Sequence, residues 1–309
     1  MDMKTDKKIK TAIIGLGKIA WAYEKDPLVG KSDDFPTHSR VLSRHPNFYL
    51  AAAQDKSGKA RNSFLSYAKD FGLTPKVYED WEAMIKKENP DLLVVASSTE
   101  SHYEICSRAI DLDIKNILCE KPISFSLKEA RKLVQKTEKN KCVLFVNYPR
   151  AFNPSYIELC KKIQKGFFGK IQSFDAKYSK GIFNNGTHVL DLLIRMFGEV
   201  KKVRGLKNLT CDFGGVDPTV SAAISFENGV SGYIHGLNGN FYNIFELDII
   251  GGLGRLKMVN DKDPRGLIDT TKGLYHVYDN IYSGINRCSG RDSLKYLEVA
   301  NKIIKSIKK

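Results

Sequence analysis

The stretch Thr11-Ala12-Ile13-Ile14-Gly15-Leu16-Gly17-Lys18-Ile19-Ala20 decides the fold of the first half of this 309-residue chain. Its first four residues form a short apolar run rich in β-forming side chains, and a Gly-x-Gly-x-x-Ala pattern follows at once. In such a pattern Gly15 permits a tight turn, Gly17 lets a pyrophosphate approach the backbone, and Ala20 keeps helix and strand close. The N–H groups that begin the next helix then face the phosphates. The stretch therefore predicts a dinucleotide-binding unit of strand, turn and helix.

The same pattern calls for an acidic residue at the end of the second strand, where it accepts hydrogen bonds from the adenosine ribose. The apolar run Phe48–Gln54 ends in Asp55, later than the usual spacing of about 20 residues. The delay has a readable cause, because Trp21–Thr37 has the proline, glycine and serine content of a loop. We interpret this loop as an insertion, and a lid over the phosphate site, before a helix near His38–Arg44. Asp55 favours NAD, although the Lys-Ser pair that follows it leaves room for NADP.

Strand-like and helix-like segments alternate at a steady pace as far as residue 146. The run Leu92–Ala96 is apolar without alternation, which is typical of a strand buried on both faces. Alternation of this kind predicts a doubly wound parallel α/β sheet, and we assign residues 1–148 to one dinucleotide-binding domain. The expected strands are Thr11–Ile14, Phe48–Asp55, Lys76–Tyr78, Leu92–Ala96, Asn116–Cys119 and Cys142–Val146.

Glu120-Lys121-Pro122 directly follows the fifth expected strand. Ligands of parallel sheets bind at the carboxyl ends of the strands, so these two charged side chains are expected to face a ligand. A surface ion pair before a turn proline is the alternative. The loop after the fourth strand brings Ser97, Thr99 and His102 to the same edge. For His102, a structural role at a helix start is equally open.

The pattern changes after residue 148, where one helix (Tyr156–Lys165) is followed mainly by β-type runs. Residues 149–309 are therefore predicted to form an α+β domain with a large, mostly antiparallel open sheet, in which Glu227-Asn228-Gly229 is a hairpin turn. Few helices are left to cover this sheet, so we expect its open face to be buried in a homodimer or homotetramer. Residues 292–307 are an amphipathic helix that we expect to pack back on the first domain.

One polar segment of this second half leads from Gly186 into an apolar helix expected over Val189–Phe197. His188 would lie in the first turn of that helix, where the macrodipole disfavours an imidazolium. A neutral imidazole suits a group that accepts a proton near neutral pH. A histidine that merely caps the helix is the alternative. The remaining histidines carry weaker signals, and His235 and His276 are expected to lie in strands.

The composition and net charge indicate which kinds of molecule this chain is expected to bind. With 42% hydrophobic and 27% charged residues the chain is ordinary for a globular protein, and no apolar run approaches the ~20 residues of a membrane helix. We expect a cytoplasmic protein without membrane contact. The net charge of +14 is dispersed over lysines, so we expect no nucleic acid and favour a phosphorylated or nucleotide-linked substrate. The six cysteines lack metal-site spacing, which predicts reduced, buried thiols and no metal.

Jointly, these motifs resemble the Gfo/Idh/MocA family of NAD(P)-dependent sugar and polyol oxidoreductases over nearly the whole chain. The resemblance rests on the Gly-rich pattern, on Glu120-Lys121-Pro122 and on Gly186-x-His188-x-x-Asp191. It implies that Lys121 is the catalytic lysine, which bridges the nicotinamide ribose and the substrate hydroxyl, and that His188 is the general acid/base. The implied substrate-binding residues are Asn184, Asp191, Arg150 and Tyr148. The implied cofactor-binding residues are Gly15, Gly17, Lys18, Ile19, Asp55, Ser97, Thr99, His102, Glu120 and Lys121, with NAD as the cofactor.

One position departs from the family pattern. Many relatives carry Asp four residues before the histidine, and this chain has Asn184 there. An amide can hydrogen-bond a sugar hydroxyl but cannot take its proton, which leaves His188 as the sole base. The preferred hypothesis is hydride transfer between nicotinamide and a hydroxyl or keto group of a sugar or sugar derivative. The alternatives are a non-catalytic dinucleotide-binding regulator or scaffold, and NAD-recycling glycoside hydrolysis or elimination on the same fold.

Overall fold

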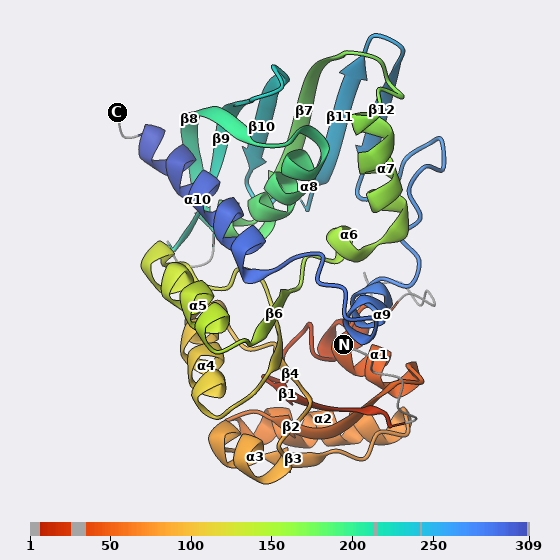
Figure 1. The fold of residues 1–309 in the computed structure, drawn as a ribbon, viewed down its shortest axis with the longest axis vertical. Coiled ribbons are helices and arrows are strands. Elements are labelled where there is room, and N and C mark those ends of the chain that lie inside the picture. The colour runs from red at the N-terminus through yellow and green to blue at the C-terminus, as the bar shows by residue number, and fades with distance from the viewer. Residues whose placement is uncertain (1–6, 26–34, 213–215, 242, 308–309) are drawn as a thin grey trace. The chain divides into compact units, whose positions relative to one another are not determined.

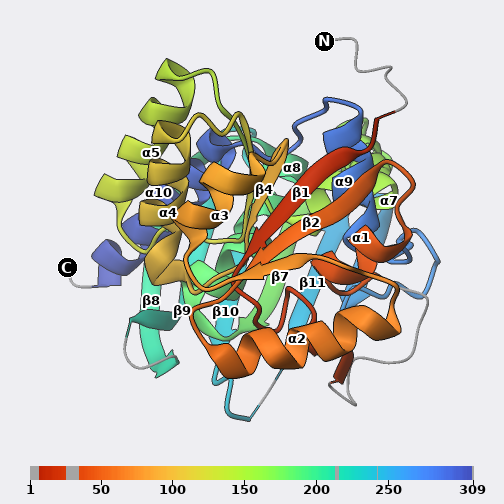
Figure 2. The same cartoon turned by 90° about the horizontal axis from the view of Figure 1, so that it is seen from below.

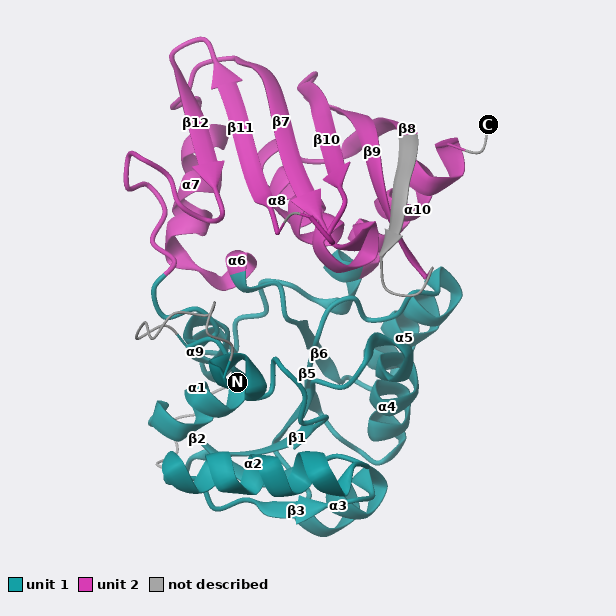
Figure 3. Ribbon diagram, turned by 180° about the vertical axis from the view of Figure 1, so that it is seen from behind, with its two compact units in different colours: residues 1–149, 271–293 teal, residues 150–270, 294–309 magenta. Residues whose placement is uncertain are grey.

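The computed structural model describes residues 7–25, 35–212, 216–241 and 243–307. The chain divides into two units, which Figure 3 shows in different colours. Unit 1 comprises residues 1–149 and 271–293, and unit 2 comprises residues 150–270 and 294–309. Within the described ranges, no helix is both long enough and apolar enough to cross a membrane.

Unit 1 is built on six parallel strands in the order β3-β2-β1-β4-β5-β6. The strand order reverses between β1 and β4, and Figure 2 shows these two strands beside β2. Ligands of such sheets bind at the carboxyl ends of the strands at this reversal point. The predicted doubly wound sheet is thereby confirmed. The strands are β1 (Ile9–Ile14), β2 (Phe48–Gln54), β3 (Lys76–Tyr78), β4 (Leu92–Val95), β5 (Asn116–Cys119) and β6 (Val143–Val146). The helices between them are α1 (His38–Arg44), α2 (Gly58–Asp70), α3 (Trp81–Glu88), α4 (Thr99–Asp111) and α5 (Leu127–Lys139).

The first crossover is interrupted in the way that the loop composition predicts. A helical turn follows Gly17, and the short 3-10 helix η1 (Ala22–Lys25) comes next. At the start of α1, the N–H groups of His38 and Ser39 donate to the carbonyls of Ile19 (3.1 Å) and Ala20 (2.9 Å). Through these two hydrogen bonds, helix α1 stacks on the turn that begins after Gly17 and continues its helical direction. Residues 26–34, the greater part of the expected lid, lie outside the described residues.

A short helix near the C-terminus, α9 (Tyr275–Tyr282), also belongs to unit 1. Its buried residues are Val277, Tyr278 and Ile281, which is helical spacing. The expectation that His276 lies in a strand is therefore wrong. The aromatic and β-branched residues around it suggested a strand, but their helical spacing buries one face of a helix against unit 1.

Unit 2 contains a second six-stranded sheet, ordered β12-β11-β7-β10-β9-β8. Only the β10–β7 pair is parallel among these neighbours, so the prediction of a mostly antiparallel sheet is confirmed. The strands are β7 (Ile171–Ser179), β8 (Val200–Asp212), β9 (Asp217–Phe226), β10 (Ser231–Leu237), β11 (Phe245–Gly251) and β12 (Gly254–Val259). Figure 1 shows α7 (Pro154–Gln164), α8 (Thr187–Phe197) and α10 (Gly290–Ile307) on one face of the sheet, and the short α6 (Pro149–Phe152) leads into the unit.

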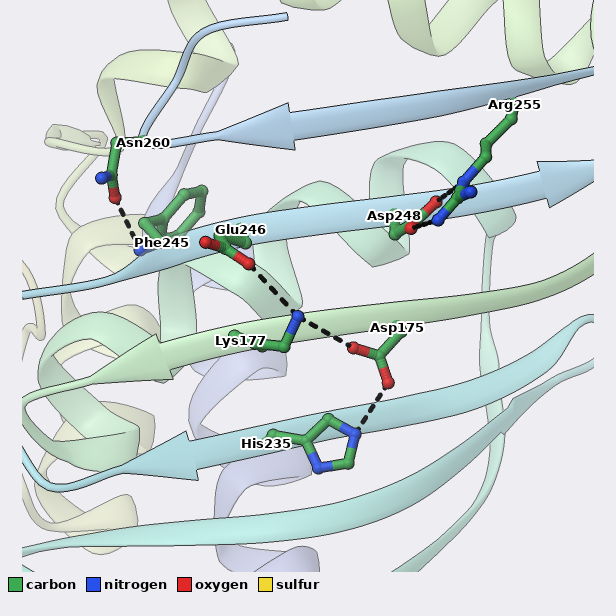
Figure 4. A network of polar contacts seen from close by, with 8 residues as sticks. All are labelled: Asp175, Lys177, His235, Phe245, Glu246, Asp248, Arg255 and Asn260. Atoms are coloured by element: carbon green, nitrogen blue, oxygen red, sulfur yellow. Dashed lines mark hydrogen bonds and ion pairs between the residues drawn. The ribbon is translucent and has the colours of Figure 1, made fainter. Parts of the chain in front are cut away.

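The other face of this sheet carries charged side chains, as Figure 4 shows. His235 Nε2 lies 2.7 Å from Asp175 Oδ2, and Lys177 Nζ lies 3.2 Å from Glu246 Oε2. Arg255 pairs with Asp248 on the neighbouring strands. Alternate residues of these strands are buried beneath the helices, which is the pattern of an antiparallel sheet with one covered face.

The cysteines behave as their scattered positions predict. Five of them lie where the structure describes side chains, and all five are buried free thiols: Cys106, Cys119, Cys142, Cys160 and Cys288. Burial raises the pKa of the Cys119 thiol well above its usual range. A protonated, buried thiol is a poor nucleophile, so packing is the role that this geometry supports.

Candidate active site

The Gly-rich loop at the end of β1 has the backbone that a phosphate site needs. Gly15 adopts φ +88°, and a Cβ at this position would lie 2.6 Å from the backbone of Ser97. A Cβ added to Gly17 would instead meet no atom within 4 Å. The loop therefore packs tightly against Ser97 at Gly15, and it leaves space at Gly17, where a pyrophosphate would approach. This backbone fits a dinucleotide.

Asp55 lies directly beside this loop. Its Oδ2 accepts a hydrogen bond from the Leu16 N–H (2.9 Å), and its Oδ1 accepts one from the Ser57 N–H (2.8 Å). Each carboxylate oxygen has a further lone pair, so the side chain can still accept from ribose hydroxyls. The structure thus brings the delayed acidic residue to the place where the dinucleotide pattern needs it.

His102 connects two loops at the carboxyl edge of the sheet. Its Nε2 lies 3.0 Å from the Ser97 carbonyl, and its Nδ1 lies 2.8 Å from the Pro122 carbonyl. The ring is buried, and both nitrogens face backbone oxygens. The ring therefore holds the segment after β5 against the loop after β4. Thr99 is the first residue of α4, immediately after this loop.

Glu120 is buried with 8% of its surface exposed, so the surface ion pair is wrong as a description of Glu120-Lys121. His38 Nε2 lies 3.0 Å from Glu120 Oε1, and the Asn147 side-chain amide donates to the same oxygen (2.5 Å). Burial acts to raise the pKa of this carboxyl, but His38, Asn147 and the charge of Lys121 outweigh it and lower the pKa. Glu120 is therefore an ionised interior group, and Lys121 follows it at the end of β5.

In unit 2 the segment before His188 is a π-helix, η2 (Gly181–Gly186), which the sequence did not indicate. The Asp217 carboxylate, at the start of β9, accepts hydrogen bonds from the N–H groups of Phe183 and Asn184, each 2.8 Å long. Gly181 has φ +83°, and a Cβ there would come within 2.0 Å of Asp217. This buried carboxylate therefore shapes the turn that carries Asn184. Single π-turns of this kind are frequent at functional sites.

The helix-dipole argument for His188 is wrong. Helix α8 begins at Thr187, but Gly186 and Thr187 both have right-handed helical backbone, so α8 continues η2 without a break. The N–H groups that begin this helical path lie near Gly181, where Asp217 accepts from two of them, and the positive end of the dipole lies there as well. His188 is buried in the middle of this helical path, with Asn184 four residues before it and Asp191 three residues after it.

The other expected substrate-binding residues are wholly or partly buried. Asp191 is fully buried; burial raises the pKa of its carboxyl despite the hydrogen bond that it accepts from Arg195 Nε (2.6 Å). Arg150 donates two hydrogen bonds to Asp261, and its guanidinium stacks 3.8 Å over the Phe245 ring. Tyr148 is also fully buried. Asp191 and Tyr148 are thus interior residues, whereas Arg150 and Asn184 are half-buried.

Sequence reasoning missed two residues that shape the site. His38 was a weak candidate because its helix follows a loop and nothing nearby marks it. Asp217 stands alone before a β-type run, and a single carboxylate there has no pattern to distinguish it from a surface residue. Their partners, Glu120 and the η2 backbone, are far away along the chain, so no local signal was available for either.

Comparison with known proteins gives a consistent picture. Residues 9–148 match the family model described as "Oxidoreductase family, NAD-binding Rossmann fold" (GFO_IDH_MocA). The chain is 28% identical to the myo-inositol 2-dehydrogenase of Thermotoga maritima, over 97% of this chain and 88% of that protein. Matches to two further curated relatives span only 52% and 38% of those proteins.

Solved structures share the fold over almost the whole chain. The WlbA dehydrogenase of Bordetella pertussis, determined with NADH and UDP-GlcNAcA, has a TM-score of 0.79 at 18% identity and covers 98% of this chain and 97% of its own. The scyllo-inositol dehydrogenase of Lactobacillus casei has a TM-score of 0.73 at 18% identity and covers 98% and 96%. At such identities the likeness establishes the architecture of both units.

We predict that Gly15→Ala destabilises the protein by more than the strain of a left-handed residue alone, which is about 1–2 kcal/mol. The added methyl group meets the backbone of Ser97, and backbone cannot move aside as a side chain can. Thermal unfolding measures the effect. Gly72→Ala is the matched control, because Gly72 also has positive φ but open space around its Cβ position. Equal losses in both variants would contradict the close contact.

We further predict that Asp217→Asn lowers stability by about 1–3 kcal/mol, the cost of leaving a buried N–H unpaired. An amide offers one oxygen where the carboxylate now accepts from two neighbouring N–H groups. Chemical denaturation measures the loss. Asp70→Asn, at the exposed end of α2, is the control and should change stability little. A variant at 217 as stable as wild type would show that the turn does not depend on this carboxylate.

Proposed function

We propose that this chain, whose residues 9–148 match the Gfo/Idh/MocA oxidoreductase model with an NAD-binding Rossmann fold, is an NAD-dependent dehydrogenase that acts on a sugar or cyclic polyol. It transfers a hydride between nicotinamide and a hydroxyl or keto carbon of the substrate. The observation that carries the proposal is the buried Glu120, which contacts His38 and Asn147 and lies immediately before Lys121 at the carboxyl end of β5. The dinucleotide loop with Asp55 lies at the same edge of the same sheet.

Two observations bear on the substrate. The relatives of this chain include myo-inositol and scyllo-inositol dehydrogenases, which favours a polyhydroxylated ring. The net charge of +14 favours a nucleotide-linked or phosphorylated sugar as the second candidate, as does the likeness to an enzyme determined with a UDP-sugar. The half-buried Asn184 suits either ring, because its amide can donate to one hydroxyl and accept from another.

Bound NAD supplies the hydride acceptor for alcohol oxidation. We assign its binding to the backbone of the Gly15–Ile19 loop at the pyrophosphate and to Asp55 at the adenosine ribose. In the oxidation direction, the carbinol hydrogen leaves with its electron pair for NAD, a ring nitrogen of His188 takes the hydroxyl proton, and the carbon–oxygen bond becomes a carbonyl. The Lys121 ammonium donates a hydrogen bond to the oxygen as negative charge develops on it. Asn184 binds a hydroxyl without taking its proton, which leaves the base role to His188.

Two other functions are compatible with the same fold. A regulator or scaffold that binds NAD without turnover needs neither Lys121 nor His188, and the chain carries both. Glycoside hydrolysis or elimination with recycled NAD uses the same first oxidation but yields no net NADH. Product analysis by mass spectrometry with a catalytic amount of NAD separates this reaction from simple dehydrogenation.

We predict that Lys121→Ala and His188→Ala each lower kcat by roughly 10²–10⁴-fold, the usual contribution of a catalytic acid, base or charge-stabilising group. Cofactor affinity should change much less, because the Gly-rich loop and Asp55 are untouched. NADH absorbance with a panel of inositols, sugars and UDP-sugars measures the rate, and titration with NAD measures affinity. If no substrate class reduces NAD in the wild type and both variants behave like it, the proposed dehydrogenase function is wrong.

We propose in addition that the charged face of the unit 2 sheet packs against the same face of a second copy. This face carries both signs of charge together with Tyr233, whose surface is 48% exposed, so it can pair with itself around a two-fold axis. Tyr233→Asp should convert a dimer or tetramer into smaller species, as measured by light scattering after size exclusion. Tyr49→Asp, on the unit 1 sheet with similar exposure, is the control. A monomeric wild type would rule out the interface.

A further inference from the structure

A series of buried hydrogen bonds ends at Glu120, the residue immediately before Lys121, to which we assign catalysis in unit 1. We propose that His38, held in orientation by Tyr278, is a positioning residue for Lys121: it keeps the Glu120 carboxylate buried and so fixes the strand end from which Lys121 extends. This inference rests on the proposed function of Lys121, and it names two residues, from α1 and α9, that the motifs do not contain.

These hydrogen bonds join two helices, α9 and α1, to the segments that follow strands β5 and β6. The Tyr278 hydroxyl lies 2.9 Å from His38 Nδ1, and His38 Nε2 lies 3.0 Å from Glu120 Oε1. Asn147, just after β6, donates to the same carboxylate oxygen. All four side chains are buried, and His38 and Tyr278 are completely so. A carboxylate removed from water needs such donors, since an unpaired buried charge costs several kcal/mol.

The charge of Glu120 fixes the direction of its hydrogen bond with His38. Glu120 is ionised and can only accept, so His38 Nε2 carries a proton and donates. Burial raises the pKa of Tyr278 well above its usual range, so its hydroxyl keeps a proton that it can donate to Nδ1 of a neutral ring. If the ring is charged, Nδ1 donates to the hydroxyl instead. In both cases Tyr278 fixes the plane of the imidazole that faces Glu120.

The backbone on either side of Glu120 is tied into the sheet. The Glu120 N–H donates to the Val95 carbonyl (2.9 Å), and the Asn147 N–H donates to the Cys119 carbonyl (2.9 Å). Lys121 is the first residue beyond these ties. Without His38, the carboxylate keeps the Asn147 donor but loses that of His38, and we expect it to turn toward water and to move the segment that carries the lysine. A displacement of about 1 Å in a catalytic group can cost roughly 100-fold in rate.

The same helix pair contains matched controls. His45 ends α1, and like His38 it is buried and contacts α9, through Asp279 (3.2 Å) and a stacked ring of Tyr275. Tyr282 lies one turn after Tyr278 on α9 and contacts the Phe48 ring, as Tyr278 does. His45→Gln and Tyr282→Phe therefore perturb the same helix packing without touching Glu120.

The test compares His38→Ala, His38→Gln and Tyr278→Phe with the two controls. In steady-state assays we expect kcat to fall about tenfold or more in His38→Ala, the size of effect that loss of a hydrogen bond to a charged group produces. His38→Gln, whose amide can still donate to Glu120, should recover part of the rate. The KM for NAD should change less than twofold, because the cofactor loop is untouched. The controls should keep the wild-type kcat.

Hydrogen exchange of the apo proteins supplies a readout that needs no substrate. The amides of residues 117–123 should exchange faster in His38→Ala and Tyr278→Phe, and at the wild-type rate in His45→Gln and Tyr282→Phe. Wild-type exchange in this segment for a folded His38→Ala protein would overturn the inference, as would an equal loss of kcat in His45→Gln. If the wild type reduces NAD with no substrate of the panel while exchange behaves as expected, the proposed function fails and the positioning of the Glu120–Lys121 segment stands.

Discussion

The need to bury a negative charge at the end of β5 governs the arrangement of unit 1. Glu120 is ionised in the protein interior, and it is stabilised there by donors from α1 and from the segment after β6. These donors come together only when the parallel sheet is complete and α9 lies against α1. The residue that bears the proposed chemistry, Lys121, thus extends from a segment whose position depends on contacts between parts of the chain up to about 240 residues apart.

Unit 2 also contains a buried carboxylate that is stabilised by hydrogen-bond donors. Asp217 is buried, and its carboxylate accepts from two adjacent N–H groups of the π-helix before His188. In each unit, therefore, an interior carboxylate fixes the backbone next to a side chain to which we assign catalysis. Interior carboxylates are costly unless fully hydrogen-bonded, so each one strongly favours a single local backbone conformation. This precision suits an enzyme better than a loosely folded scaffold.

The sequence departs from the Gfo/Idh/MocA pattern at one position, where Asn184 replaces an acidic residue. In the proposed reaction, Asn184 can hydrogen-bond a substrate hydroxyl but cannot take its proton, so we assign proton transfer to His188. His188 lies within a continuous helical path, so its basicity is not governed by the dipole of a helix start.

The sequence by itself determined the parallel sheet of unit 1, the mostly antiparallel sheet of unit 2, the family and the cofactor class. Each of these rests on local information: hydrophobic period, the glycines after β1, and short motifs at strand ends. It also located the interruption of the first crossover, because loop composition is visible residue by residue. Tertiary structure alone decided that Glu120 is buried, that Arg150 and Asp191 are held by Asp261 and Arg195, and that His276 lies in a helix. The physical reason is that the free energy of a charged or polar side chain depends on partners distant in the chain, and no local pattern records which partners folding brings to it.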